Sequence, residues 1–315
     1  MKLKITLLLA GCILGILANR NKEYLIDGQF LRNNLHLRKP VANKTEILNS
    51  KNVMILLTFG QSNAGNYGGG NYRTKHILYN YYRGNLYLAD EPLLGTDGKG
   101  NSVWTRLGDM LIDSGICKRV IIIPFAIGGT SIQSWVSGEP RKKLDEILEY
   151  LREDGLKPTH ILWQQGETDN VDRTTKEQYK NRLKQLIKIF RDNKLQAPFY
   201  TSITSYFPYN NENILGIDTN ITQAQLEVTK EIYNVKEGPN TDQINLAYYR
   251  SDGVHMSEKG LEKLSLEWYK KMKNIDVKEI IAVMDELEKE RGISKDYLVA
   301  ALEEALVKAY KQNFD

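Results

Sequence analysis

The stretch Val53-Met54-Ile55-Leu56-Leu57-Thr58-Phe59-Gly60-Gln61-Ser62-Asn63 decides the fold. Its first seven residues form an almost continuous apolar run, which is typical of a β-strand buried on both faces. Strands of this kind occur in parallel sheets that helices cover on both sides. A glycine and polar residues follow at once, so the strand is predicted to end in a turn that presents Ser62.

The same alternation continues across residues 50–274. Apolar runs at 119–124 and 159–163 predict two more buried strands, and weaker runs at 199–204 and 244–247 predict another two. Strands that alternate with helices indicate an α/β fold with a parallel sheet covered on both faces. The amphipathic segments that predict the helices are 141–153, 174–193, 222–233 and 258–273.

In such a sheet, ligands bind at the carboxyl ends of the strands, so the residues that follow each strand are the candidates for a site. Four segments qualify, and each by itself is as well explained by a simple turn. Together they would meet at one end of the sheet, where Ser62, His255 and Asp252 supply a nucleophile, a base and an orienting carboxylate. The four segments are 60–65, 126–131, 163–169 and 251–255.

The chemistry of these residue types is specific. Serine is a weak nucleophile, so His255 must take its proton, and Asp252, three residues earlier, can accept the other imidazole N–H. Backbone N–H groups beside glycines can approach a substrate closely and stabilise an oxyanion. Glu167 and Asp169 are expected to hold the third loop by hydrogen bonds, because no histidine stands near them in the sequence.

As a set, the motifs resemble the four blocks of the SGNH hydrolase superfamily: Gly60-Gln61-Ser62-Asn63, Gly128-Gly129-Thr130-Ser131-Ile132-x-x-Trp135, Trp163-x-Gln165-Gly166-Glu167-x-Asp169 and Asp252-x-x-His255. They are similar in particular to its carbohydrate acetylesterase branch, which includes sialic-acid O-acetylesterases and acetylxylan esterases. The resemblance implies a three-layer α/β/α sandwich with a flavodoxin-like parallel sheet over residues 50–274. It also implies hydrolysis of O-acetyl esters on sialic acid or hemicellulose, through an acetyl-enzyme and without a metal or other cofactor.

The resemblance also assigns roles to residues. Ser62, Asp252 and His255 would form the triad, and the oxyanion hole would use the N–H groups of Ser62 and Gly129 with the side chain of Gln165. The broader superfamily places an asparagine in the third block, and none stands here, so Gln165 takes that role. The residues expected to support the site or bind substrate are Gln61, Asn63, Gly128, Thr130, Trp135, Glu167 and Asp169.

Two other functions remain open at this stage: a lipase-like SGNH hydrolase that acts on longer acyl esters, and a noncatalytic glycan-binding surface protein. The 43 Lys+Arg against 39 Asp+Glu give no reason to expect a nucleic acid as partner. Four histidines without a His-Glu-x-x-His motif exclude a metalloprotease helix. The tyrosine-rich segment 65–101 fits either a sugar-stacking wall or a packed insertion.

The N-terminus predicts export from a bacterial cell. Lys2 and Lys4 precede an apolar run to residue 18, which fits a signal peptide over 1–18. Leu9-Ala10-Gly11-Cys12 resembles a lipoprotein signal, in which a lipidated Cys12 would anchor the protein to a membrane; cleavage after Ala18 is the alternative. Residues 19–49 read as a polar tether, so the enzyme would be periplasmic, secreted or lipid-anchored at the cell surface.

The C-terminal segment 275–315 differs in charge from the rest, with a net −4 against +8 for residues 1–274. Apolar residues at helical spacing predict a helical hairpin, with Gly292 ending one helix and Ser294 capping the next. The segment resembles the first forty or so residues of the bacterial transcription factor NusA, which in that family begin the domain that contacts RNA polymerase. Only these opening helices are present, so no transcription function is inferred.

Overall fold

The computed structural model describes residues 38–209, 215–273, 284–285, 288–289 and 292–301. The predicted signal peptide with Cys12, most of the tether and most of the C-terminal hairpin lie outside these residues. The chain divides into two compact units, residues 1–271 and 272–315. In the second unit, Gly292 has a positive φ of 66°, and the N–H of Tyr297 donates to Ser294 Oγ at 3.3 Å, which is the cap that the sequence predicts.

The first unit is built on a seven-stranded sheet in the order β3-β2-β4-β1-β5-β6-β7. All pairs are parallel except β2–β3, which form a hairpin. Without that hairpin, the order of the five remaining strands along the chain is 2-1-3-4-5, the flavodoxin-like order that the resemblance implies. The strands are β1 (Val53–Gly60), β2 (Tyr79–Tyr82), β3 (Asn85–Leu88), β4 (Arg119–Ala126), β5 (His160–Gln164), β6 (Phe199–Ile203) and β7 (Val235–Asn240).

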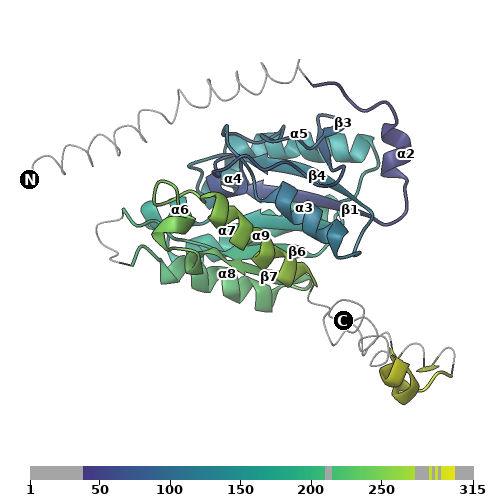
Figure 1. The fold of residues 1–315 in the computed structure, drawn as a ribbon. Helices are drawn as coiled ribbons and strands as arrows, with labels where there is room; N and C mark the ends of the chain where they lie inside the picture. Colours follow the sequence, from purple (N-terminus) through teal and green to yellow (C-terminus); the bar gives the residue numbers. More distant parts are fainter. Residues whose placement is uncertain (1–37, 210–214, 274–283, 286–287, 290–291, 302–315) are drawn as a thin grey trace, which may run out of the picture. The chain divides into compact units, whose positions relative to one another are not determined.

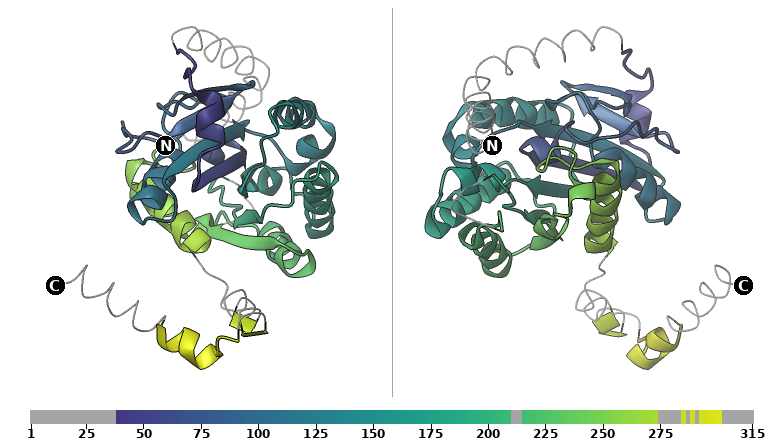
Figure 2. Two further views of the ribbon diagram at one scale, coloured as in Figure 1. Left: turned by 90° about the vertical axis from the view of Figure 1, so that its right-hand side faces the viewer. Right: turned by 60° about the vertical axis from the view of Figure 1, so that its left-hand side comes forward.

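Helices cover both faces of the sheet, which confirms the three-layer arrangement (Figures 1 and 2). One layer contains α3 (Trp104–Asp113) and α9 (Glu258–Lys273), and the other contains α4 (Ile132–Ser137), α5 (Glu139–Glu153), α7 (Lys176–Asp192) and α8 (Thr219–Glu231). The four longest of these match the predicted helices. Shorter elements, which the sequence patterns missed, are α2 (Lys44–Leu48), α6 (Glu167–Val171) and the 3₁₀ turns η1 (Ser62–Ala64), η2 (Thr241–Gln243) and η3 (Ala247–Tyr249).

Aromatic side chains form a dense core directly beneath the strand ends. Phe59 is fully buried, and its ring lies 4.7 Å from Trp163 and 5.6 Å from Trp135, centroid to centroid. On the opposite face, the buried ring of Trp268 packs 5.5 Å from that of Trp104, centroid to centroid. Each such buried side chain contributes about 1.5–3 kcal/mol to stability. The end of β1 therefore packs against a rigid aromatic core.

One predicted strand is wrong. Residues 244–246 lie between η2 and η3, residue 247 begins η3, and the fifth parallel strand is β7 at Val235–Asn240. Its sequence, Val-Lys-Glu-Gly-Pro-Asn, has no apolar run. An edge strand tolerates charges and a proline because one of its sides has no neighbouring strand to satisfy. The pattern of apolar residues therefore does not predict the strand at the edge of the sheet.

The segment 65–101 is mostly packed structure. It contains β2 and β3, in which Tyr81 and Tyr87 are buried. Tyr72 donates to Asp109 Oδ2 at 2.7 Å, with the guanidinium of Arg106 4.1 Å from its ring centroid. Tyr67, treated below, packs against His255.

The last part of the predicted tether also belongs to the fold. The N–H of Val41 donates to Leu86 O at 2.8 Å, and Ile47 of α2 is buried in the core. Lys44 Nζ pairs with Asp154 at 2.7 Å. Residues 38–49 therefore cover one edge of the first unit. Among the described residues, no helix is long and apolar enough to cross a membrane.

Candidate active site

Ser62 stands at the sharp turn where β1 ends. Gly60 has a φ of +142°, and a Cβ added there would lie 2.0 Å from Gln164 O, so only glycine fits. The turn places Ser62 at the start of η1, beside β4 and β5, the strands between which the order of the sheet reverses. Among the described residues, the N–H of Ser62 donates to no protein acceptor.

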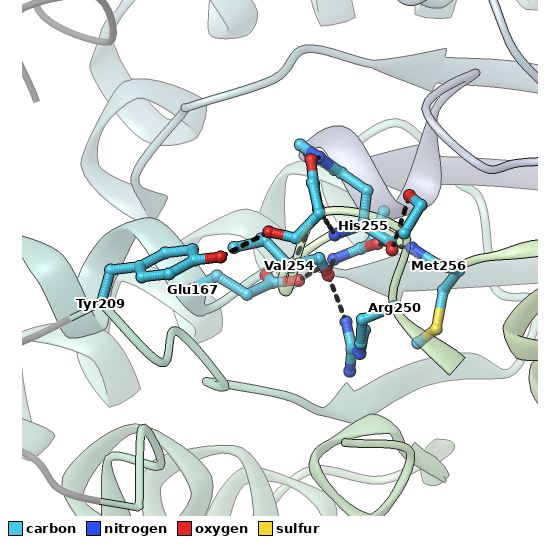
Figure 3. A network of polar contacts seen from close by, with 9 residues as sticks. Glu167, Tyr209, Arg250, Val254, His255 and Met256 are labelled. Atoms are coloured by element: carbon cyan, nitrogen blue, oxygen red, sulfur yellow. Dashed lines mark hydrogen bonds and ion pairs between the residues drawn. The ribbon is translucent and has the colours of Figure 1, made fainter. Parts of the chain in front are cut away.

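Asn63 joins this turn to the loop that carries His255. Its Nδ2 donates to Glu167 Oε1 at 2.8 Å and to Val254 O at 3.3 Å, and its Oδ1 accepts from the N–H of Met256 at 3.3 Å. Both chain neighbours of His255 are thereby held to the residue after Ser62 (Figure 3). The loop that carries His255 is therefore held against the turn that carries Ser62, although 192 residues separate the two in the sequence.

Asp252 and His255 form the pair that the sequence predicts. His255 Nδ1 lies 2.6 Å from Asp252 Oδ2, while Asp252 Oδ1 accepts the N–H groups of Val254 at 2.9 Å and His255 at 2.7 Å. Burial opposes ionisation of Asp252, but these hydrogen bonds outweigh it, so the pKa of the carboxyl lies below its ordinary value. Because Nδ1 faces the carboxylate, it holds the proton, and Nε2 is the free basic nitrogen.

Two further side chains hold this loop from outside, and the sequence analysis missed both. Arg250 is buried and donates to the carbonyls of Ile244 at 2.7 Å, Thr241 at 2.8 Å and Val254. The hydroxyl of Tyr209 donates to Asp252 O at 2.6 Å (Figure 3). The position of Arg250, two residues before Asp252, was a usable signal, whereas Tyr209 comes from a distant loop that carries no motif.

The loop after β4 presents the glycines. The N–H of Gly128 donates to Asp97 Oδ2 at 2.8 Å, and Asp97 is another residue that sequence reasoning missed. Gly129 has a φ of +66°, and a Cβ there would meet nothing within 4 Å, so its backbone faces open space. Among the described residues, the N–H of Gly129 has no protein acceptor, as an oxyanion donor requires.

Gln165 does not fit its predicted role as an oxyanion donor. Its side chain is fully buried, and Nε2 donates to Thr130 O at 2.9 Å and to Asp169 Oδ2 at 2.6 Å. A primary amide has two N–H bonds, and three buried acceptors lie within hydrogen-bond distance of this nitrogen, the third being Gln61 Oε1 at 3.2 Å, so neither N–H is left for a ligand. Gln165 therefore ties the second loop to the third, and its amide is directed into the protein.

In Gln61 the amide oxygen is hydrogen-bonded within the protein and, among the described residues, the amide nitrogen is not, which is what the role of an oxyanion donor requires. Its Oε1 accepts from the N–H groups of Gly166 at 3.3 Å and Thr168 at 3.1 Å and from Gln165 Nε2 at 3.2 Å, which fixes which amide atom is oxygen. Its Nε2 donates to no residue that the structure describes, although the side chain is only 3% exposed. The residue before Ser62 thus holds a free amide donor at the site.

Trp135 supports the glycine loop from inside the protein. Its side chain is fully buried among Phe59, Phe125 and Trp163, and Nε1 donates to Thr130 Oγ1 at 3.0 Å. The hydroxyl of Thr130 in turn donates to Ile127 O at 2.7 Å. Trp135 and Thr130 therefore brace the glycine loop from behind.

Glu167 and Asp169 lie in the buried network and not against His255. Burial raises the pKa of both carboxyls. Asp169 accepts from the N–H of Ile132 at 2.7 Å and from Thr174 Oγ1 at 2.6 Å, which connects α6 with the start of α4. Within the described residues, no group of three histidine, cysteine or acidic side chains is placed to bind a metal.

One known protein family matches most of the first unit. The model of the family described as carbohydrate esterase, sialic acid-specific acetylesterase, matches residues 51–274. The chain belongs to this family. It is therefore a carbohydrate acetylesterase, a carboxylic ester hydrolase whose substrates are acetylated carbohydrates. The model of the NusA N-terminal domain matches residues 279–315.

Solved structures share the fold. A protein of Arabidopsis thaliana is 22% identical with a TM-score of 0.55, and the match covers 71% of this chain and 98% of that one. A family 3 carbohydrate esterase of Clostridium thermocellum is 17% identical (TM-score 0.46; 71% and 96% covered). A variant of the acetyl xylan esterase Axe2 from Geobacillus stearothermophilus is 14% identical (TM-score 0.46; 71% and 95% covered). None of the curated proteins compared matches the chain.

Proposed function

We propose that this acetylesterase works through a serine triad of Ser62, His255 and Asp252 and cleaves O-acetyl esters of sialic acid or hemicellulose sugars. The observation that carries the proposal is the 2.6 Å contact between His255 Nδ1 and Asp252 Oδ2, on a loop that Asn63 holds beside Ser62. A nucleophile, a base and an orienting carboxylate are the parts that acyl transfer requires.

The first half of the reaction forms an acetyl-enzyme. His255 Nε2 takes the proton from Ser62 Oγ as this oxygen attacks the acetyl carbonyl carbon. The tetrahedral intermediate places negative charge on the carbonyl oxygen. The N–H groups of Ser62 and Gly129 and the amide Nε2 of Gln61 would donate to it, in place of the Gln165 amide that the motif suggested.

Collapse of the intermediate breaks the bond to the sugar oxygen. His255 gives its proton to that oxygen, the sugar leaves with a free hydroxyl, and the acetyl group stays on Ser62. A water molecule then attacks the acetyl carbonyl while His255 accepts its proton. The second tetrahedral intermediate collapses, the bond between the acetyl carbon and Ser62 Oγ breaks, and His255 gives its proton to Ser62 Oγ as acetate leaves. Asp252 keeps the imidazole in the required tautomer throughout and stabilises the imidazolium that forms twice in each cycle.

The sugar is the finer part of the proposal. The family description names sialic acid, and this supports testing acetylated sialic acids first. A panel of acetylated sialic acids and acetylated xylo-oligosaccharides, with mass analysis of the products, would rank them. A series of 4-nitrophenyl esters would separate this function from a lipase-like one, because an acetylesterase loses activity sharply as the acyl chain lengthens.

The decisive experiment is Ser62→Ala, assayed with 4-nitrophenyl acetate. Loss of the nucleophile of a serine triad typically lowers kcat by about 10⁶-fold. The control is Ser114→Ala, at the end of α3, whose hydroxyl donates only to Leu111 O at 3.1 Å; this variant should retain the full rate. Full activity of Ser62→Ala at the Tm of the unmodified protein would sink the proposal.

A further inference from the structure

The ring of Tyr67 lies between the two catalytic loops. It stacks on the imidazole of His255, with centroids 5.0 Å apart and planes at 21°. On the other loop, a Cβ added to Gly128 would lie 2.8 Å from Tyr67 Oη and 3.1 Å from Cζ. Tyr67 therefore fills the place that a side chain at Gly128 would need, and it touches the proposed base at the same time.

The backbone on both sides of Tyr67 is fixed. The N–H of Asn66 donates to Asp97 O at 2.9 Å, and Gly68 exchanges two hydrogen bonds with Asn101, at 2.9 and 2.8 Å. The N–H of Gly69 donates to Met256 O at 2.9 Å, which ties this strand of chain to the residue after His255. The ring is therefore held in place by its own backbone before it meets the imidazole.

The imidazole needs such support. The His255 side chain is 23% exposed and that of Asp252 is 55% exposed. Asn63 and Arg250 bind the backbone of this loop and not the imidazole itself. Among the described residues, Asp252 makes the only hydrogen bond to the ring of His255, and Tyr67 supplies the only aromatic face against it. One hydrogen bond sets a direction but leaves the ring free to tilt about it.

We infer that Tyr67 is a positioning residue of the proposed hydrolase, and that its ring fixes the imidazole of His255 relative to the Gly128–Gly129 loop. The inference rests on the proposed function, because it assigns His255 the role of base. The stack has a second consequence. An aromatic face within about 6 Å of a cation attracts it, so the ring favours the imidazolium that forms as Ser62 gives up its proton. The contribution is realised in the transition state and should therefore raise kcat.

The test compares Tyr67→Leu with Tyr67→Phe in the full-length protein. Leucine removes the aromatic face, so kcat for 4-nitrophenyl acetate should fall about tenfold while KM changes less than threefold. Phenylalanine keeps the face, so it should retain kcat within twofold. Tyr72→Leu is the matched control. It removes a tyrosine of the same segment that bonds to Asp109, so it should lower Tm while kcat changes less than twofold.

A second variant tests whether the Tyr67 ring couples the loop of His255 to the loop of Gly128. The methyl of Gly128→Ala meets the end of the Tyr67 ring, so this variant should lose more kcat in the unmodified protein than in the Tyr67→Leu background. Additive losses would remove the claim that Tyr67 couples the two loops. A Tyr67→Leu variant with unchanged kcat, or a Tyr67→Phe variant as slow as Tyr67→Leu, would overturn the positioning role. Either result leaves the proposed function standing if Ser62→Ala is inactive, so the two proposals fail separately.

Discussion

The two halves of the site differ in how the protein holds them. On the nucleophile side, Gln61, Ser62 and Asn63 are each at most 5% exposed and lie within a continuous buried hydrogen-bond network. On the base side, the side chains of Asp252 and His255 are 55% and 23% exposed, and they stand on a loop with no helix or strand of its own. The nucleophile side is part of the buried core, whereas the base side is a loop attached to that core.

The nucleophile side is rigid because its polar groups are too deeply buried to rearrange cheaply. A buried donor or acceptor that loses its partner costs about 1–3 kcal/mol. Gln61, Gln165 and Asp169 satisfy one another and three neighbouring loops at once, so moving any of them breaks several bonds. The same network therefore sets both the stability of this end of the sheet and the positions of the N–H groups of Ser62 and Gly129.

The base side depends on a few contacts that can be removed one at a time. Asn63, Arg250 and Tyr209 hold the backbone of its loop, and Tyr67 meets the imidazole. The side chains of Asp252 and His255 themselves contribute less to folding, because they are partly solvated. The comparison teaches that substitutions on the base side should change catalysis with little effect on stability, and that substitutions on the nucleophile side should change both.

Asp252→Asn is the strongest test of the base side. Its amide would present an N–H to Nδ1 of His255 and select the wrong tautomer, a change that costs about 10⁴-fold in kcat in serine triads. Tm should fall only slightly, because an ion pair of an exposed carboxylate is worth little. The lowered pKa of Asp252 means that its stabilising effect is present above the ordinary carboxyl pKa and disappears as pH falls through the lowered value.

Steady-state kinetics with 4-nitrophenyl acetate and thermal unfolding between pH 3 and 8 would check both parts. The small difference in Tm between the variant and the unmodified protein should be constant near neutral pH and should shrink at the acid end. A variant that loses several degrees at pH 7 would show that the base side is also part of the folding core, and the comparison would then break.

Gln61→Glu probes the nucleophile side at its catalytic surface. The substitution keeps an oxygen to accept the N–H groups of Gly166 and Thr168 but replaces the free Nε2 with a second carboxylate oxygen. Removal of one oxyanion donor lowers kcat by about 10²–10³. We expect that loss for Gln61→Glu, with a lower Tm as well, because the new charge is buried.

Gln165→Glu is the paired variant for the same measurement. It places a carboxylate against Asp169 and Thr130 O, so its main effect should be on Tm. If Gln165→Glu folds at the Tm of Gln61→Glu but loses more kcat, the oxyanion donor is Gln165 after all.

The sequence predicted what depends on local pattern. The apolar run of β1 and the glycine and polar residues that end it are signals of a buried strand and a turn, and they located Ser62 correctly. The short spacing of Asp252 and His255 restricted both to one loop, so their hydrogen bond followed from the motif.

It failed where tertiary contacts choose among similar residues. Gln61 and Gln165 are both glutamines at strand ends, and only the positions of Thr130 and Asp169 decide which amide is occupied. Trp135 sits in a motif, yet Phe59, Phe125 and Trp163 bury it completely. Tyr67 was one tyrosine among several in its segment, and only the folded chain brings it to His255.

Glu167→Gln should give the smallest effect of these variants. It tests the nucleophile side through thermal stability alone. Glu167 is 2% exposed, and its Oε2 has no hydrogen-bond partner among the described residues. Burial raises the pKa of this carboxyl, although Asn63 and the charge of Arg250 oppose the shift. A carboxyl whose pKa is raised by folding contributes stability that is present below its ordinary pKa and is lost as pH rises through the raised value.

Glutamine has nearly the same shape and does not titrate, so it should remove that loss. At pH 8 the variant should have a Tm higher by roughly 2–4 °C, about what 1 kcal/mol gives for a domain of this size, and the difference should shrink as pH falls toward 4. Glu262→Gln, on the exposed face of α9, is the control and should leave Tm unchanged at every pH. A Glu167→Gln variant that is less stable at pH 8 would mean that the ionised carboxylate is stabilised, through Arg250. The nucleophile side would then contain a buried ion pair of Glu167 and Arg250, and not a carboxyl group whose ionisation is disfavoured by burial.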